Sequence, residues 1–224
     1  MQAQSLVKII PGQEAQSNDI QEIVKTDVAN SPYYKKIDVF NLTNTNSRII
    51  LSRFATRQQK TNYTCAPVAA MMVADYYLGT CPYDEIATAK IMGTNKLNGT
   101  NVNGVKKFFE QLDWNITDSH STPAPKNYPS FTSWVKKNLL AKRPIIVENV
   151  EWGGHWRVII GFDDMGTPVE DDDILFFADP FDSTDHIRDG YTICSAKRFF
   201  YMWFDAKLFN GSDKERPYLI ASPK

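Results

Sequence analysis

Residues that bind metals or form cross-links are scarce in this sequence. Its 224 residues include only three histidines and three cysteines, Cys65, Cys81 and Cys194, and no two cysteines have zinc-site spacing. The histidines lie far from the cysteines in the chain, so we expect no metal site. The odd cysteine number leaves at least one thiol free unless chains cross-link, although Cys65 and Cys81 would be able to pair in a secreted protein.

An excess of one charge and long apolar runs are also missing. The chain has 25 Lys and Arg against 26 Asp and Glu, a formal net charge of -1, which argues against a nucleic-acid-binding protein. No apolar run approaches the ~20 residues that span a bilayer, so we expect no membrane span. The N-terminal stretch lacks the apolar core of a signal peptide. We therefore expect a soluble protein, either cytoplasmic or secreted with a signal peptide that this sequence does not contain.

Hydrophobic patterns place helices before strands. Residues 1–30 are polar and predict a loosely ordered N-terminal arm, followed by one domain over 31–224. Such an order is typical of an α+β fold. The expected elements are short strands at 36–42 and 48–54, helices at 65–79, 82–93, 100–112 and 130–142, and strands at 144–152, 155–164, 173–180 and 216–222, while 195–204 fits either a helix or a strand.

Cys65 stands where the first long helix is expected to begin. Pro67 suits a first helical turn, and Gly79 suits the position just after a helix. The free N–H groups and the dipole at a helix N-terminus stabilise a thiolate, which makes Cys65 a candidate nucleophile. The alternative is a small buried hydrophobic residue.

A nucleophilic thiol needs a base, and His155 is the best candidate. It begins an apolar strand after two glycines, which allow another backbone to approach closely, whereas His120 and His186 lie in polar stretches. The base in turn needs an orienting group. Asp179 ends the next apolar strand and suits that role, with Asp182 and Asp163 as weaker candidates, and a turn aspartate before proline as the alternative.

Acyl transfer also requires donors for a developing oxyanion. The Cys65 backbone N–H is one candidate, and a side-chain amide upstream is the second. Gln59 is six residues before the cysteine and Gln58 is seven before it. We favour Gln59 and keep Gln58 as the alternative.

These residues in this order resemble a papain-like cysteine peptidase. More narrowly, "CAPVAAMMV", "GGHWRVIIGFDD" and "FADPFD" resemble the bacteriocin-processing peptidases of cysteine peptidase family thirty-nine, over roughly half of the chain. The resemblance implies a bacterial thiol protease with a two-lobed fold that acts on a peptide or protein and needs no cofactor. It also implies roles by residue: Cys65 as nucleophile, His155 as general base, Asp179 as orienting group and Gln59 as oxyanion donor.

Two other functions stay open at this point. A thiol acyltransferase similar to phytochelatin synthase would use the same residues with an amine or thiol acceptor. A non-catalytic peptide-binding module would keep only the cleft.

Two further features of the sequence lead to expectations. Trp152 and Trp156 flank His155 and would be able to wall a cleft. The acidic stretch 163–173 predicts a solvated hairpin loop, with a calcium site as the alternative.

Overall fold

The computed structural model describes residues 37–183, 188–205 and 215–224, so the expected arm over residues 1–30 lies outside the described residues. Within the described ranges the chain forms helices and an antiparallel sheet, as an α+β fold requires. The helices are α2 (Cys65–Leu78), α3 (Glu85–Met92), α4 (Val102–Gln111), α5 (Tyr128–Leu140) and α6 (Ala196–Met202). The strands are β1 (Arg48–Ile50), β2 (Asn115–Asp118), β3 (Ile145–Asn149), β4 (His155–Asp163), β5 (Ile174–Ala178), β6 (Tyr191–Ser195) and β7 (Tyr218–Ser222).

The sheet is antiparallel, and β4 lies near its centre. The strand order is β2-β7-β3-β4-β5-β6, and β1 pairs with the second half of β4. All nine residues of β4 are buried. Since side chains alternate between the faces of a strand, both faces of β4 are covered, and α2 and α5 both pack against it. The dense Ile, Val and Phe content of this segment follows from that burial.

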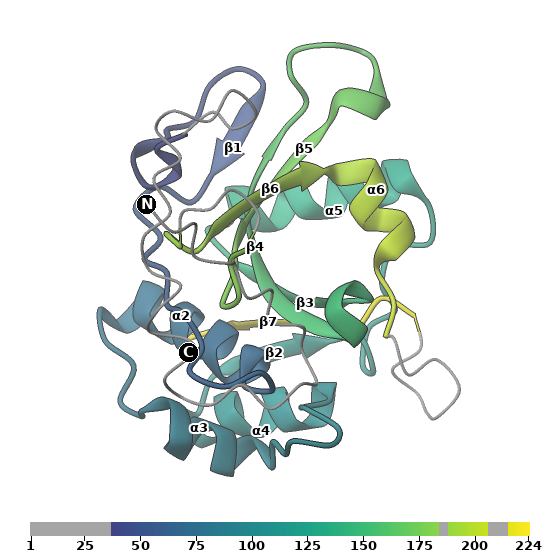
Figure 1. Ribbon diagram of the computed structural model, residues 1–224. Helices are drawn as coiled ribbons and strands as arrows, with labels where there is room; N and C mark the ends of the chain where they lie inside the picture. The colour runs from purple at the N-terminus through teal and green to yellow at the C-terminus, as the bar shows by residue number, and fades with distance from the viewer. Residues whose placement is uncertain (1–36, 184–187, 206–214) are drawn as a thin grey trace, which may run out of the picture.

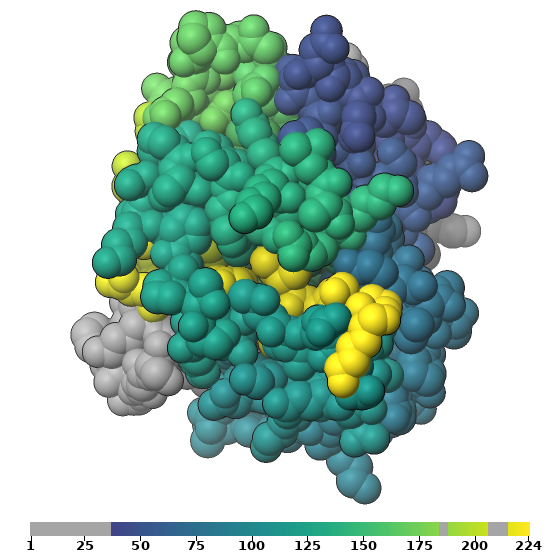
Figure 2. All heavy atoms as spheres, turned by 180° about the vertical axis from the view of Figure 1, so that it is seen from behind, coloured from purple at the N-terminus to yellow at the C-terminus, as the bar shows by residue number. Residues whose placement is uncertain are grey.

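The elements gather in two groups (Figure 1). Helices α2, α3 and α4 lie in the lower half of the view, whereas β1, β5, β6, α5 and α6 lie in the upper half. Strands β3, β7 and β2 run between the groups, and from behind the last residues of the chain, in yellow, cross the surface there (Figure 2). The first ten residues of α2 are all buried, because α3, α4 and β4 surround this helix.

The predicted helices are present, and the starts of two of them are corrected: α3 begins at Glu85 rather than at 82, because Asp84 caps it. Helix α5 begins at Tyr128 rather than after Ser130, because Asn127 caps it: the Asn127 side chain accepts from the Ser130 N–H and the Ser130 hydroxyl bonds back. Pro129 fits the first turn, which needs no N–H donor. The ambiguous segment 195–204 is resolved as α6, whose N-cap is Ser195.

Some strand predictions were wrong. Residues 36–42 were expected as a strand, but Val39–Asn41 form a short 3-10 helix, η1, whose N-cap Asp38 accepts from the Asn41 N–H. The strand expected over 144–152 ends at Asn149, and a second 3-10 helix, η2 (Glu151–Gly153), follows it. Strands β2 and β6 were not predicted. Both are short and contain polar residues, so their pairing with β7 and β5 determines their conformation.

Candidate active site

Cys65 is the first residue of α2, as its sequence context predicted. The residue is 8% exposed, and its thiol forms no disulfide. Thr64 is the N-cap, yet its side chain makes no capping hydrogen bond to the first turn. Because Cys65 is the first residue of the helix, it lies at the positive end of the helix dipole.

His155 and Asp179 come together because β4 and β5 are antiparallel. His155 is the first residue of β4, and Asp179 directly follows the last residue of β5. The start of one strand lies beside the end of the other, which brings His155 Nε2 to 2.7 Å from Asp179 Oδ1. Both side chains are almost completely buried. Asp179 engages Nε2, which leaves the other ring nitrogen, Nδ1, and the Cys65 side chain is among the groups that raise the pKa of this imidazole.

Both carboxylate oxygens of Asp179 are hydrogen-bonded. Oδ1 accepts from the Phe181 N–H at 2.9 Å in addition to the imidazole, and Oδ2 accepts from the Thr192 hydroxyl at 3.2 Å. A carboxylate with partners on every side has a fixed orientation, and it therefore fixes the ring plane of His155.

A buried arginine supports this pair, and the sequence reasoning did not identify it. Arg157 Nη1 is 3.7 Å from Asp179 Oδ2, and Nη2 is 3.1 Å from Glu151 Oε2. Its guanidinium also lies 4.0 Å from the centre of the Phe177 ring. A signal for it existed in the sequence, since a residue two positions after His155 on a strand lies on the same face.

The charges of this cluster reinforce one another. Burial alone would lower the pKa of His155, but the Asp179 charge and the hydrogen bonds from Asp179 and Cys65 raise it to about 10. Burial would raise the pKa of Asp179, but the His155 charge and hydrogen bond, together with Arg157, lower it to about 2. At neutral pH the imidazole is therefore protonated and the carboxylate ionised.

Gln59 is buried beside the start of α2. Its backbone N–H donates to the Pro180 carbonyl at 2.8 Å, which ties it to the turn after Asp179. One side-chain N–H donates to the Thr61 carbonyl at 2.6 Å, and Nε2 has a second hydrogen to donate. Gln59 Oε1 is buried and has no hydrogen-bond partner among the described residues.

Gln58 has a different environment. Its Nε2 donates to the Asp179 carbonyl at 2.8 Å, and its Oε1 accepts from the Asp182 N–H at 3.2 Å. The side chain thus braces the turn that carries Asp179. Asp182 contributes to the same turn, since its Oδ2 accepts from the Gly190 N–H at 3.0 Å.

The two tryptophans beside His155 differ in position. The Trp152 ring contacts Phe181 edge-on at 5.9 Å, and Phe181 in turn lies 6.5 Å from the His155 ring. Trp152 has a φ of 57°, a left-handed conformation that is strained for a bulky residue. Trp156 instead points into the core, where its Nε1 donates to the Thr100 carbonyl. Trp152 is therefore linked to His155 through the ring of Phe181, whereas the expectation that Trp156 walls a cleft was wrong, because Trp156 is buried in the core.

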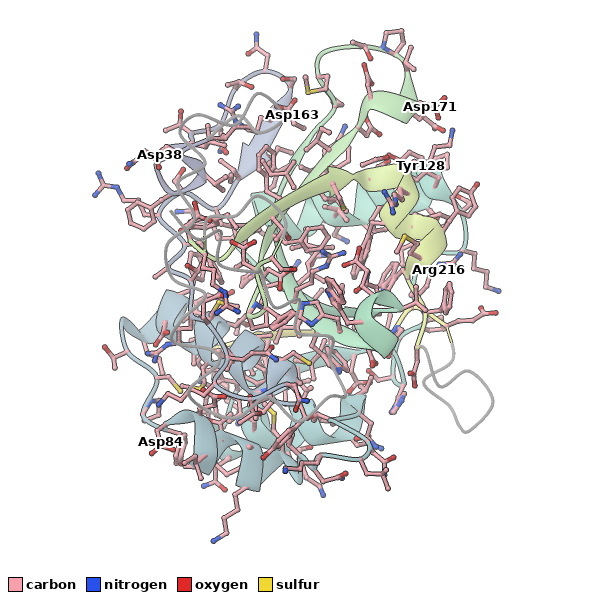
Figure 3. The ribbon with its side chains drawn as sticks, viewed as in Figure 1. Asp38, Asp84, Tyr128, Asp163, Asp171 and Arg216 are labelled. Atoms are coloured by element: carbon pink, nitrogen blue, oxygen red, sulfur yellow. The ribbon has the colours of Figure 1, made fainter. Side chains whose placement is uncertain are left out.

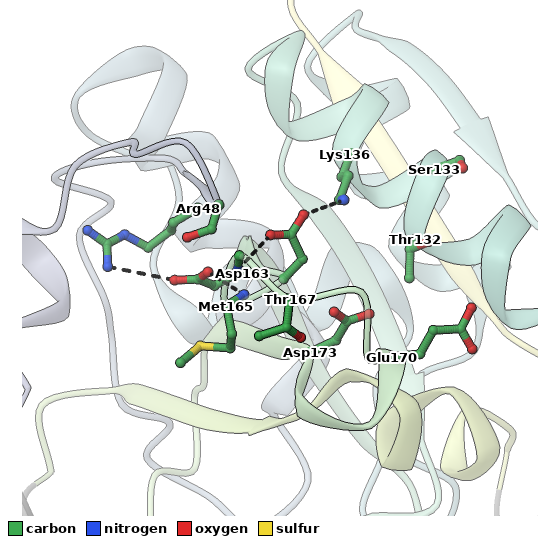
Figure 4. Close-up of polar contacts among 12 residues, drawn as sticks. Arg48, Thr132, Ser133, Lys136, Asp163, Met165, Thr167, Glu170 and Asp173 are labelled. Atoms are coloured by element: carbon green, nitrogen blue, oxygen red, sulfur yellow. Dashed lines mark hydrogen bonds and ion pairs between the residues drawn. The ribbon is translucent and has the colours of Figure 1, made fainter.

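The acidic stretch 163–173 forms the loop between β4 and β5, at the opposite end of β4 from His155. Figure 4 shows the ion pair between Asp163 of this stretch and Arg48. Five of its six acidic side chains have cationic or hydroxyl partners: Asp163 with Arg48, Asp164 with Lys136, Asp171 with Lys197, Asp172 with Thr167 and Asp173 with Tyr128. Among the described residues, no group of three or more His, Cys, Asp or Glu side chains is arranged to hold a metal ion. Asp163 is thus not brought to His155.

Comparison with known proteins shows the family of this chain. The model of the Peptidase_C39 like family matches residues 51–203, more than half of the chain. The chain belongs to this family. The matched range contains the four residues Gln59, Cys65, His155 and Asp179. A search of curated proteins found no match.

A solved structure with a similar fold is the peptidase domain of Streptococcus ComA, described as a bi-functional ABC transporter involved in a quorum sensing pathway. It superposes with a TM-score of 0.52 at 17% identity, covering 76% of this chain and 99% of that domain. The fold is therefore the papain-like one, with a helical lobe packed on an antiparallel sheet. None of the described helices is long and apolar enough to cross a membrane.

Proposed function

We propose that the protein is a cysteine peptidase that hydrolyses a peptide or isopeptide amide through a covalent acyl-enzyme on Cys65. The observation that supports this most directly is the contact between α2 and β4. There, Cys65 is the first residue of the helix and raises the pKa of His155, whose Nε2 is 2.7 Å from the buried carboxylate of Asp179. A nucleophile, a base and an orienting group in that order are what thiol acyl chemistry needs.

The proposed reaction begins with the Cys65 thiolate and the protonated His155. The sulfur attacks the amide carbon, and the carbonyl oxygen becomes an oxyanion that accepts from the Cys65 N–H and from the second Nε2 hydrogen of Gln59. His155 then donates its proton to the leaving nitrogen, and the C–N bond breaks to give a thioester. Neutral His155 next takes a proton from water, which attacks the thioester and releases the acid. Collapse of the second intermediate expels the Cys65 thiolate, and His155 keeps the proton taken from water, so both groups return to their starting state and no step needs a cofactor.

The acyl acceptor separates this proposal from its main rival. In a thiol acyltransferase, an amine or thiol would take the place of water at the thioester. A non-catalytic binding module, by contrast, would have no use for a buried, hydrogen-bonded pair of His155 and Asp179 that is coupled to Cys65. The hydrogen bonds and the raised pKa of His155 therefore support an enzyme over a binding module.

The test is cleavage of a diverse peptide library in oxygen-18 water, analysed by mass spectrometry. We expect wild-type products whose new carboxylates carry the label, and no products from Cys65→Ala. His155→Ala should lose about 10²–10⁴-fold in rate, whereas His120→Ala, an exposed histidine, should retain activity. Unlabelled products joined to an added amine or thiol would support the acyltransferase, and peptide binding without any product would support the binding module.

The oxyanion donor has its own test. Because Gln59 would act on charge that develops in the transition state, Gln59→Ala should lower kcat by about 10²–10³-fold with KM little changed. Alkylation of Cys65 by iodoacetamide should survive, since it passes through no oxyanion. Gln58→Ala is the matched control. It should be milder, because its amide is engaged with the turn at Asp179 and Asp182.

A further inference from the structure

The loop of residues 60–64 joins the two groups that the proposed function assigns to the oxyanion. Gln59 precedes the loop and Cys65 follows it, so its conformation determines how the two donors lie relative to each other. Gln59 is anchored at its own N–H by Pro180, and its side chain is anchored within the loop by Thr61. At the other end the Thr64 hydroxyl lies 2.9 Å from the Thr61 hydroxyl within the loop, and a further anchor comes from outside the loop.

That anchor is Glu85, the first residue of α3. Its carboxylate is buried, with 7% of the residue exposed. Glu85 Oε1 accepts from the Lys60 backbone N–H at 2.9 Å and from the Thr64 hydroxyl at 2.5 Å. A single oxygen atom from a neighbouring helix therefore holds the first and last residues of the loop together.

The bond to Thr64 has a second consequence at the start of α2. An N-cap threonine usually accepts from the N–H of the second or third helical residue. Here the third residue is Pro67, which has no N–H, and the Thr64 hydroxyl donates to Glu85 and makes no capping bond. The Thr64 side chain therefore accepts from no N–H group of the first turn.

We propose that Glu85 is a positioning residue for the oxyanion hole, an inference that rests on the proposed function. It does not touch the substrate. Its carboxylate fixes the loop between the two donors and turns the N-cap hydroxyl away from the helix. The thiol and its histidine lie outside this arrangement, since His155 is held from β5 by Asp179. Loss of Glu85 should therefore impair the chemistry of the oxyanion while the reactivity of the thiol stays intact.

The experiment measures kcat and KM on a library peptide that the wild type cleaves, together with the rate at which iodoacetamide alkylates Cys65. Glu85→Ala should lower kcat by about 10–100-fold through misplaced donors, with KM and alkylation within about twofold of wild type. Glu85→Gln should stay within about fivefold, because its amide oxygen still accepts from Lys60 and Thr64.

The matched control is Asp84→Ala, one residue earlier. Asp84, labelled in Figure 3 at the start of α3, caps that helix by accepting from the Ala87 N–H at 2.7 Å. Its loss should lower stability through the cap but leave kcat unchanged, which separates a positioning effect from a general weakening of α3. If Glu85→Ala does not fold, Thr64→Val removes one of the two bonds to Glu85, together with the hydroxyl contacts to Thr61, at nearly constant shape. It should show a smaller loss of kcat with the same pattern.

A double-mutant cycle with Gln59→Ala gives the decisive result. If Glu85 acts through the oxyanion hole, Glu85→Ala should cost much less in the Gln59→Ala background than in the wild type, since neighbouring groups in one network are not additive. Additive losses, or kcat and alkylation falling together, would overturn the inference. An inactive wild type would overturn the proposed function as well, whereas an active wild type with a sensitive Gln59 and an indifferent Glu85 would overturn this inference alone.

Discussion

Asp179→Asn tests how the carboxylate controls the charge of His155. The two side chains are 2.7 Å apart and both are buried, so the carboxylate charge acts on the imidazole with little screening by solvent. At an effective dielectric constant of ~20, two unit charges at that separation attract by about 6 kcal/mol. One pKa unit corresponds to ~1.4 kcal/mol, so the charge contributes up to about 4 units. An asparagine oxygen would still accept from Nε2 and retain part of this effect.

We therefore expect the pKa of His155 to fall by at least ~2 units in Asp179→Asn, from about 10 in the wild type. The measurement is an NMR titration of the histidine ring protons, with the His155 signal assigned by its loss in His155→Ala. The alkaline limb of kcat/KM should move in the same direction, because activity needs the protonated imidazole. Asp182→Asn, a second buried aspartate, serves as control and should shift His155 much less.

Stability should follow the same linkage. The folded-state pKa of His155 lies above its ordinary value of 6.5, so its contribution to stability is fully present below about pH 6.5 and is lost as pH rises through about 10. In Asp179→Asn that loss should begin at lower pH. The variant should also be weaker at neutral pH by about 1–3 kcal/mol, since both carboxylate oxygens face donors and an NH₂ group would oppose one set of them. A wild-type His155 that titrates near 6.5, or an unchanged midpoint in the variant, would refute this reasoning.

Two further predictions concern the thiols and a helix contact. With limiting iodoacetamide near neutral pH, Cys65 should react before Cys81 and Cys194, because burial raises the pKa of both others, that of Cys194 to about 11; peptide mapping that shows equal labelling would count against an activated Cys65. Gly104→Ala should destabilise the fold by about 1–3 kcal/mol in urea unfolding, since its Cβ would lie 2.6 Å from the Met92 backbone oxygen; an unchanged midpoint would mean that α3 and α4 can separate slightly at no cost.

The parts of the site that the sequence predicted are those with a local signal. Cys65 stands at a change from polar to apolar residues that matches the start of a buried helix, and His155 and Asp179 stand at the ends of consecutive apolar segments. Consecutive strands tend to pair, so the ends that carry these two residues were expected to meet. The contact between them then depends only on one hairpin, which is the simplest tertiary relation for a sequence to encode.

The residues that reasoning from sequence missed depend on packing between distant elements. Arg157 interrupts an apolar strand and reads as a solvent-facing residue, until the ring of Phe177 and the carboxylates of Glu151 and Asp179 are placed around it. Glu85 reads as an ordinary first-turn acid on a helix, and only the packing of α3 on α2 brings it to the loop before Cys65. For Glu85 no periodicity or spacing signals its partners, and for Arg157 the two-residue offset from His155 indicates only a shared face of the strand.

The residues of the proposed reaction come from two halves of the fold. The base and its orienting group belong to β4 and β5, whereas the nucleophile, Gln59 and the loop anchored by Glu85 belong to the helical half. The halves meet where α2 packs against β4 and where the Gln59 N–H donates to the Pro180 carbonyl in the turn after Asp179. This backbone hydrogen bond connects Gln59, the proposed oxyanion donor, to the turn that follows Asp179. A change that shifts α2 along β4 would therefore separate the thiol from its base before either half lost its own hydrogen bonds.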